Sequence, residues 1–228
     1  MNPLSDIQIV SEPGNFRFCE DWRCKFIQSA FSVEQMDEVY TESMNLRLWQ
    51  NVSDRTRGVN GIRLKAGVWT EEGHHFKPLF RGYTKSTTQT KRAVLDRELP
   101  QILTLLQPLS FKLSQFIPNS FCGNLVAGID FQHMNLPFNI FSMAFLQTGI
   151  SDKLDVDRND YISCLVMVRG KDEGVILNNV VFKLNVGDAL LFESDKIRHK
   201  TYQSSCDDRL VLIFVLHKTV LRHFGYEV

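Results

Sequence analysis

The chain has 228 residues, of which 43% are hydrophobic and 23% are charged, the balance of a globular protein that buries a full core without cross-links. Lys and Arg number 26, as do Asp and Glu, so the formal net charge is zero and a globally basic nucleic-acid-binding protein is not indicated. No apolar run approaches 18 residues, which argues against a transmembrane helix. The N-terminus, MNPLSDIQIV, lacks the basic and apolar regions of a secretory signal.

The five cysteines are scattered and form no C-x-x-C pair, so neither a disulfide framework nor a cysteine zinc site is expected. Cys164 lies in the apolar run ISCLVMV and is predicted to be a small buried core residue. Together with the absence of a secretory signal, this cysteine usage predicts an intracellular protein, nuclear or cytoplasmic, with no membrane partner.

The first half of the chain predicts helices and loops. Residues up to about 27 are expected to form one or two short edge strands. Ser32 and Gln35 form a capping-box pattern, and the apolar spacing that follows predicts a helix over 33–49. A second helical pattern runs over 90–116, and three prolines are expected to break it into two helices: Pro100, Pro108 and Pro118.

The second half of the chain predicts a β structure. Its segments FSMAFLQTGI, YISCLVMVRG, GVILNNVVFKLNVGDALLFES and RLVLIFVLHKTV are β-branched, aromatic-rich and separated by turn residues. No helical pattern interrupts them, so antiparallel pairing in a barrel or jelly roll is expected. The sequence therefore predicts one α+β domain over 1–228, with a helical and loop region over 1–118 and a β core over 119–228.

The segment 55–92 is strongly basic, with nine Lys and Arg against two Glu and a net charge of +7. One interpretation is a solvated loop whose charge is balanced elsewhere. The other is a surface for nucleic-acid phosphates, with aromatic residues that stack on bases or anchor the loop in the core. These aromatic residues are Trp69, Phe76 and Tyr83.

Candidate chemistry lies in the β half. Asp155 and Asp157 are two residues apart, so on a strand they share a face and can reach one ion. His199 lies 42 residues after Asp157, and Arg209 follows ten residues later. Two carboxylates and an imidazole can form an open three-ligand metal site, and an arginine beside it can clamp a carboxylate. Each feature taken alone is more often a solvated turn, a surface or core histidine, or a rim residue.

The order and spacing of these residues resemble the 2-oxoglutarate- and Fe(II)-dependent oxygenases, most closely the TET/JBP-like branch, which oxidises 5-methylpyrimidines in nucleic acids. The resemblance covers roughly residues 120–220 and rests on three segments, SDKLDVDRNDYISCLVMVRG, EGVILNNVVFKLNVGDALLFESDKIRHKTY and DDRLVLIFVLHKTV. It implies a double-stranded β-helix core (a cupin-like jelly roll) with the N-terminal helices packed on it.

The resemblance also implies roles for individual residues. Asp157 and His199 match the family's carboxylate and distal histidine ligands, and Asp155 stands where the family has its first metal histidine. The implied catalytic and metal-binding residues are therefore Asp155, Asp157 and His199, with Fe(II) as the metal. Arg209 matches the arginine that pairs with the far carboxylate of 2-oxoglutarate, and Tyr161 is expected to contact this cosubstrate.

Asp155 departs from the family pattern in a way that bears on activity. A second carboxylate adds a negative charge, favours harder metals over iron and opposes the 2-oxoglutarate dianion. The expected function is an O₂- and 2-oxoglutarate-dependent dioxygenase acting on a methylated pyrimidine in DNA or RNA, bound through the basic 55–92 segment. The alternatives are an impaired or inactive oxygenase-fold binding protein, and a hydroxylase of a small molecule or protein.

Overall fold

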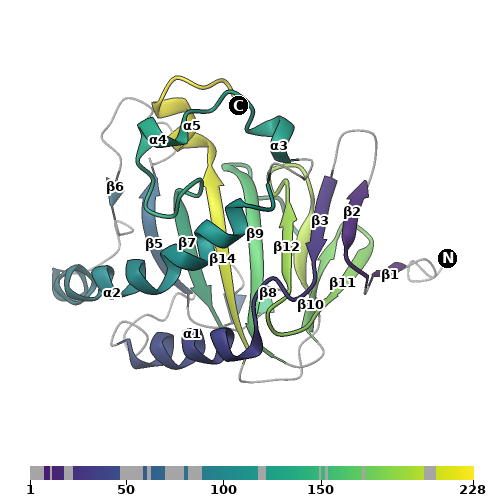
Figure 1. The fold of residues 1–228 in the computed structure, drawn as a ribbon, viewed down its shortest axis with the longest axis horizontal. Helices are drawn as coiled ribbons and strands as arrows, with labels where there is room; N and C mark the ends of the chain where they lie inside the picture. The colour runs from purple at the N-terminus through teal and green to yellow at the C-terminus, as the bar shows by residue number, and fades with distance from the viewer. Residues whose placement is uncertain are drawn as a thin grey trace.

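The computed structural model of the chain describes residues 8–10, 12–17, 23–46, 59–60, 63–69, 80–81, 89–117, 122–148, 150–151, 154–170, 173–202 and 209–228. Two β-sheets face each other, and two long helices cover the outer face of the larger sheet (Figure 1). This is the α+β double-stranded β-helix that the sequence predicted.

The larger sheet has eight strands in the order β2-β3-β12-β9-β14-β7-β5-β6, and every neighbouring pair is antiparallel. Its strands, in sheet order, are Gly14–Arg17, Arg23–Ile27, Ala189–Phe192, Asp160–Arg169, Leu210–His217, Met143–Gln147, Arg63–Trp69 and Phe80–Arg81. The N-terminal region contributes half of these strands, so it completes the sheet as well as covering it.

The smaller sheet has four strands in the order β1-β11-β10-β13. These strands are Gln8–Val10, Val180–Leu184, Glu173–Leu177 and His199–Tyr202. β1 pairs with β11 in parallel, whereas the other two pairs are antiparallel. Beside β13, Asp155 forms a single antiparallel bridge with His199. A separate two-stranded ribbon pairs β4 (Val59–Asn60) with β8 (Ile150–Ser151).

Alternation along the strands divides the interior into two cores. On β14, Leu210, Leu212 and Phe214 enter the core between the large sheet and the helices, here called the helix-side core. Val211 enters the core between the two sheets, here called the inter-sheet core. Successive side chains on a strand point to opposite faces, so a strand buried on both faces reads as an unbroken apolar run. The segment RLVLIFVL is apolar from its second residue onward because β14 is buried on both faces.

Helix α1 (Val33–Asn45) begins with the predicted capping box. Ser32 Oγ accepts from the Gln35 N–H at 3.3 Å, and Gln35 Oε1 accepts from the Ser32 N–H at 3.2 Å. The predicted end at 49 is wrong, because Leu46 is already extended, with ψ 126°, and its side chain is buried in the helix-side core.

Helix α2 (Gln89–Ser114) is a single helix with Pro100 and Pro108 inside it, so the predicted break into two helices is wrong. A buried stripe on one face of the helix consists of Ile102, Leu106, Leu109 and Leu113. Each proline removes one backbone hydrogen bond, but both rings lie on the exposed side, and packing of the stripe on the sheet outweighs the loss. Pro118 lies outside the described residues.

The remaining helices are short and lie near the C-terminus of the chain (Figure 1). They are α3 (Cys122–Leu125), α4 (Phe131–Met134) and α5 (Lys218–His223), which directly follows β14. In the described part of the chain, no helix is long and apolar enough to cross a membrane. Cys164 is 1% exposed, which confirms its predicted place in the core.

Candidate functional site

The structure brings Asp157 and His199 together. His199 is the first residue of β13, and Asp157 lies in the turn that leads into β9. His199 Nε2 lies 3.1 Å from Asp157 Oδ2. The His199 ring also packs edge-on against Phe192, an inter-sheet core residue, with 5.1 Å between the ring centroids. The pair therefore lies at the rim of the space between the two sheets.

Backbone contacts orient both side chains. The Asp157 N–H donates to the Ser194 carbonyl at 3.0 Å, and the Asp157 carbonyl accepts from the Asp160 N–H at 2.8 Å. His199 Nδ1 lies 3.0 Å from the Ile197 carbonyl. A carbonyl only accepts, so the proton of neutral His199 is assigned to Nδ1, and Nε2 turns a lone pair toward Asp157. Metal-binding histidines are commonly held in this way through the second ring nitrogen.

The neighbourhood shifts the protonation of His199. Burial against Phe192 lowers its pKa, whereas the hydrogen bond and the charge of Asp157 raise it, and the net result is a pKa above the ordinary 6.5. A proton on His199 Nε2 thus lies between this nitrogen and the Asp157 carboxylate, which would otherwise direct lone pairs at each other. A metal cation at the same place would have the same effect.

Asp155 lies beside this pair but does not join it. Its backbone exchanges hydrogen bonds with His199, N–H to carbonyl in both directions at 3.3 and 2.9 Å. Its exposed carboxylate accepts from the Val156 N–H at 2.9 Å. Among the described residues, no three His, Cys, Asp or Glu side chains are grouped closely enough to hold a metal ion. The structure therefore shows the Asp157–His199 pair, and the third ligand remains a prediction.

Arg209 is buried, with 3% exposure, directly before β14. It stands two residues before Val211, which belongs to the inter-sheet core. A buried guanidinium can bind a carboxylate, and the role of Arg209 toward 2-oxoglutarate remains a prediction. Arg209 also interacts with other groups of the protein.

Tyr161 is placed differently from the other predicted site residues. Its ring packs against the helix-side core, and its hydroxyl donates to the Leu125 carbonyl at 3.3 Å. Tyr161 lies near the start of β9, whereas Leu210, the neighbour of Arg209, pairs with Arg169 at the end of β9. The structure therefore does not bring Tyr161 and Arg209 together.

A buried polar cluster next to Asp157 was not anticipated from the sequence. His217 Nε2 lies 3.7 Å from Asp160 Oδ1, and His217 Nδ1 lies 2.6 Å from Thr219 Oγ1. Beside them, Lys218 Nζ lies 2.5 Å from Asp195 Oδ2. The only sequence signal is that Asp160 follows Asp157 by one turn and that His217 and Lys218 end an apolar strand.

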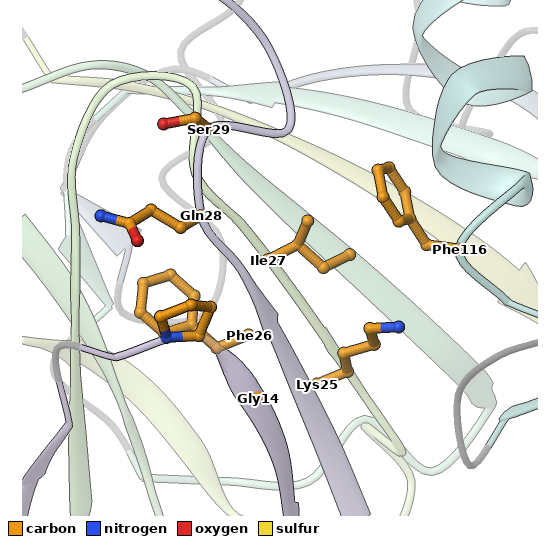
Figure 2. A pocket seen from close by; sticks show the side chains of 8 residues that line it. Gly14, Lys25, Phe26, Ile27, Gln28, Ser29 and Phe116 are labelled. Carbon is orange, nitrogen blue, oxygen red and sulfur yellow. The ribbon is translucent and has the colours of Figure 1, made fainter.

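A hollow of about 570 Å³ lies elsewhere, between β3 and the end of α2. Lys25, Ile27 and Phe116 face one another across it, with Lys25 Nζ 6.0 Å from the centre of the Phe116 ring (Figure 2). None of the predicted site residues lines this hollow. It is therefore separate from the candidate site.

The structure describes only part of the basic 55–92 segment: residues 59–60, 63–69, 80–81 and 89–92. Phe76 and Tyr83 lie outside the described residues, and of Trp69 only the backbone, at the end of β5, is described. The role of this segment in nucleic-acid binding remains a prediction.

Comparisons with known proteins identify the fold. No family model matches the chain, and no curated protein matches it. The solved structure of NgTET1 in complex with 5mC DNA aligns with a TM-score of 0.64 and 16% identity, over 86% of this chain and 73% of NgTET1. A Pseudomonas putida prolyl-4-hydroxylase is more distant, with a TM-score of 0.46 and 11% identity over 85% of this chain and 92% of the hydroxylase. The chain thus has the double-stranded β-helix fold of NgTET1, as its sequence resemblance to the TET/JBP-like branch predicted.

Proposed function

We propose that this protein is a 2-oxoglutarate- and Fe(II)-dependent dioxygenase that oxidises a methylated pyrimidine base in nucleic acid. The observation that carries the proposal is the contact between Asp157 and His199 at the rim of the inter-sheet space. These two residues come from distant parts of the chain and match two ligands of the family. NgTET1, which shares the fold, was solved with 5mC DNA.

The geometry of the pair fits two ligands of one metal ion. Two ligand atoms bound at right angles, each about 2.1 Å from the metal, are about 3 Å apart. The observed separation of Nε2 and Oδ2 is 3.1 Å. An imidazole and a carboxylate are two members of the facial set that holds non-haem Fe(II). Asp157 and His199 would hold the metal.

Asp155 would supply the third metal ligand, and Arg209 would bind the cosubstrate. Asp155 and His199 are direct cross-strand partners, so their side chains share a face with Cβ atoms about 5 Å apart. A rotation of the Asp155 side chain away from the Val156 N–H would make its carboxylate available as a ligand. Arg209 would bind the far carboxylate of 2-oxoglutarate. The metal and cosubstrate, when bound, supply the oxidation of a C–H bond by O₂.

The fold and the basic segment over 55–92 together support a nucleic-acid substrate. A base within a duplex must leave the stack before an enzyme can act on it, and backbone phosphates must be held meanwhile. The +7 segment over 55–92 would hold the phosphates. Binding to a methylated duplex should then weaken steeply as salt concentration rises, whereas binding of a neutral metabolite should not.

The hydrogen bond of the Asp155 carboxylate to the Val156 N–H favours a second function, that of a non-catalytic binding protein. The described residues also form no three-membered ligand group. With two carboxylates, the site would also carry more negative charge than the usual set with one. This arrangement favours a binding protein that keeps the oxygenase fold without catalysis.

Succinate formation distinguishes the two functions. The purified chain is incubated with Fe(II), ascorbate, 2-oxoglutarate and a duplex containing 5-methylcytosine, with an unmethylated duplex as the control. The oxygenase proposal expects succinate and an oxidised base from the methylated duplex, and loss of both products in His199→Ala. If the wild type forms neither while binding the duplex, the binding protein is the correct assignment.

Asp155→His tests the role of the departure from the family pattern. The substitution removes one negative charge and supplies an imidazole, so Fe(II) affinity should rise about 10-fold or more, by analogy with losses of that size from outer-shell changes. Isothermal titration with Fe(II) under anaerobic conditions measures it. Asp155→Asn, which removes the charge without adding a ligand, is the matched control. Equal affinity in all three proteins would show that residue 155 does not bind the metal.

A further inference from the structure

We infer that the ion pair between Lys218 and Asp195 positions the candidate metal ligands. The ion pair fixes the turn over residues 193–198, and this turn holds both Asp157 and His199. The inference rests on the proposed function for the meaning of the site, and it assigns a positioning role to residues outside the ligand set.

One turn contacts both ligands. The Ser194 carbonyl accepts from the Asp157 N–H at 3.0 Å, and the Ile197 carbonyl lies 3.0 Å from His199 Nδ1. The turn is closed internally, because the Ile197 N–H donates to the Glu193 carbonyl at 2.9 Å. A shift of this turn would therefore move two ligands that lie 42 residues apart in the sequence.

The ion pair connects this turn to the start of α5. Lys218 Nζ lies 2.5 Å from Asp195 Oδ2, and the two side chains are 14% and 5% exposed. A pair this buried is screened little by salt. Asp195 Oδ1 is buried and has no hydrogen-bond partner among the described residues, and the neighbouring Lys196 bonds to Glu193 instead. Lys218 is thus in direct contact with the buried carboxylate of Asp195 and compensates its charge.

The backbone of Lys218 contacts the turn that carries Asp157. Its N–H donates to the Asn159 carbonyl at 2.7 Å, within the turn in which the Asp160 N–H donates to the Asp157 carbonyl. Lys218 therefore contacts the Asp157 turn through its main chain and the Ser194–Ile197 turn through its side chain. Replacement of the side chain removes the second contact and leaves the first, so the contribution of the ion pair can be measured by itself.

Cobalt(II) binding tests the inference, because the visible spectrum of Co(II) reports the geometry of its ligands. Lys218→Met removes the charge and keeps most of the length, and we expect Co(II) affinity to fall about 10- to 100-fold, as for other groups that orient metal ligands. Lys218→Arg should restore affinity and spectrum. Asp195→Asn should resemble Lys218→Met, and the double variant should be no weaker than either single variant, because both changes remove one contact.

The matched control is Arg222→Met, which removes a cation from the same helix. The Arg222 guanidinium donates to the Val228 carbonyl at 2.8 Å, on an exposed part of α5. This variant should keep wild-type Co(II) affinity and spectrum. The inference is overturned if Arg222→Met matches the loss in Lys218→Met, or if Lys218→Met leaves affinity and spectrum unchanged.

A metal-free measurement separates this inference from the proposed function. ¹⁵N NMR of the His199 ring reports whether Nδ1 carries the proton that bonds to Ile197. We expect this tautomer to dominate in the wild type above the pKa of His199 and to lose population in Lys218→Met but not in Lys218→Arg. If the wild type binds no Co(II) but shows this pattern, the metal site fails and the positioning role stands. An unchanged tautomer population in Lys218→Met would refute the positioning role whatever the metal result.

Discussion

His199 and Asp157 form a pair whose stability depends on what lies between them. Without a cation, the Nε2 lone pair and the carboxylate repel each other, and protonation of the imidazole relieves the repulsion. The same proton must leave when a metal binds. The pair therefore couples proton binding to metal binding at one atom.

In the metal-free protein we expect a His199 pKa above 6.5, because burial lowers this pKa less than the hydrogen bonds and charges of Asp157, the Ile197 carbonyl and Asp160 together raise it. A raised pKa in the folded state means that this pair stabilises the fold fully below pH 6.5, and that the contribution is lost as pH rises through the folded pKa. Metal affinity should rise over the same interval. An NMR titration of the His199 ring measures the pKa.

Asp157→Asn is the control for this titration, since the amide keeps the shape of the side chain and removes its charge. The His199 pKa should fall in this variant relative to the wild type. A wild-type pKa at or below 6.5 would contradict the geometry. An equal pKa in both proteins would show that Asp157 is not the cause of the shift.

At the scale of residues, two of the three predicted metal ligands, Asp157 and His199, lie together in the structure, but the sequence did not predict the contacts that hold them. Asp157 and His199 were found from their order and spacing within a recognisable series of strands. The contacts of Asp195 with Lys218 and of Asp160 with His217 join segments 23 and 57 residues apart. Acids and bases at such separations leave no periodic signal, so only the three-dimensional structure pairs them.

Among the helices and strands, α2 shows local preference overridden by packing. Pro100 and Pro108 predicted two helices, yet one helix continues through both because its buried stripe lies on the sheet. The capping box of α1 was predicted correctly, because both of its partners lie within four residues. Short-range signals identified the ends of elements well where no tertiary contact competed with them.

Replacement of Pro108 by Ala should stabilise the protein. Pro108 is exposed, and the new N–H can donate to the Thr104 carbonyl, one turn earlier in α2. Proline is about 3 kcal/mol less favourable than alanine inside a helix, although the more flexible unfolded chain of the variant offsets part of this difference. Urea denaturation should therefore show a gain of about 1–2 kcal/mol in the free energy of unfolding. A loss of stability would show that the proline geometry is needed for the stripe to pack.

For the whole molecule, the large sheet separates two cores with different roles. The helix-side core stabilises the fold, whereas the inter-sheet core also borders the proposed site through Phe192, which packs against His199. The sequence predicted the jelly roll, because the segments over 141–220 are short, β-branched, aromatic-rich and separated by turn residues. It did not predict β3 and β5 as inner strands of the large sheet, because their pairing partners lie far away in the chain.

Two neighbouring residues on β14 test this division. Leu212→Ala opens a cavity in the helix-side core and should cost about 2–5 kcal/mol in the free energy of unfolding. Its affinity for 2-oxoglutarate should remain that of the wild type. Val211→Ala, on the inter-sheet side close to Arg209, should be less destabilising but should weaken 2-oxoglutarate binding. Chemical denaturation and titration of 2-oxoglutarate into the metal-loaded proteins measure the two effects.

If Leu212→Ala weakened 2-oxoglutarate binding and Val211→Ala did not, this reverse pattern would place the cosubstrate on the helix side of the large sheet. Equal losses of affinity in both variants would show that the two cores are not independent. The reverse pattern, but not equal losses, would remove Arg209 from the proposed role.

The parallel pairing of β1 with β11 joins Gln8 to Val180. During synthesis, the strand that completes one edge of the small sheet leaves the ribosome long before its partner. Contacts between such distant segments form late and slow the folding reaction. Nascent chains of this protein should therefore spend a long time with apolar strands uncovered, the state in which folding intermediates aggregate and chaperones bind.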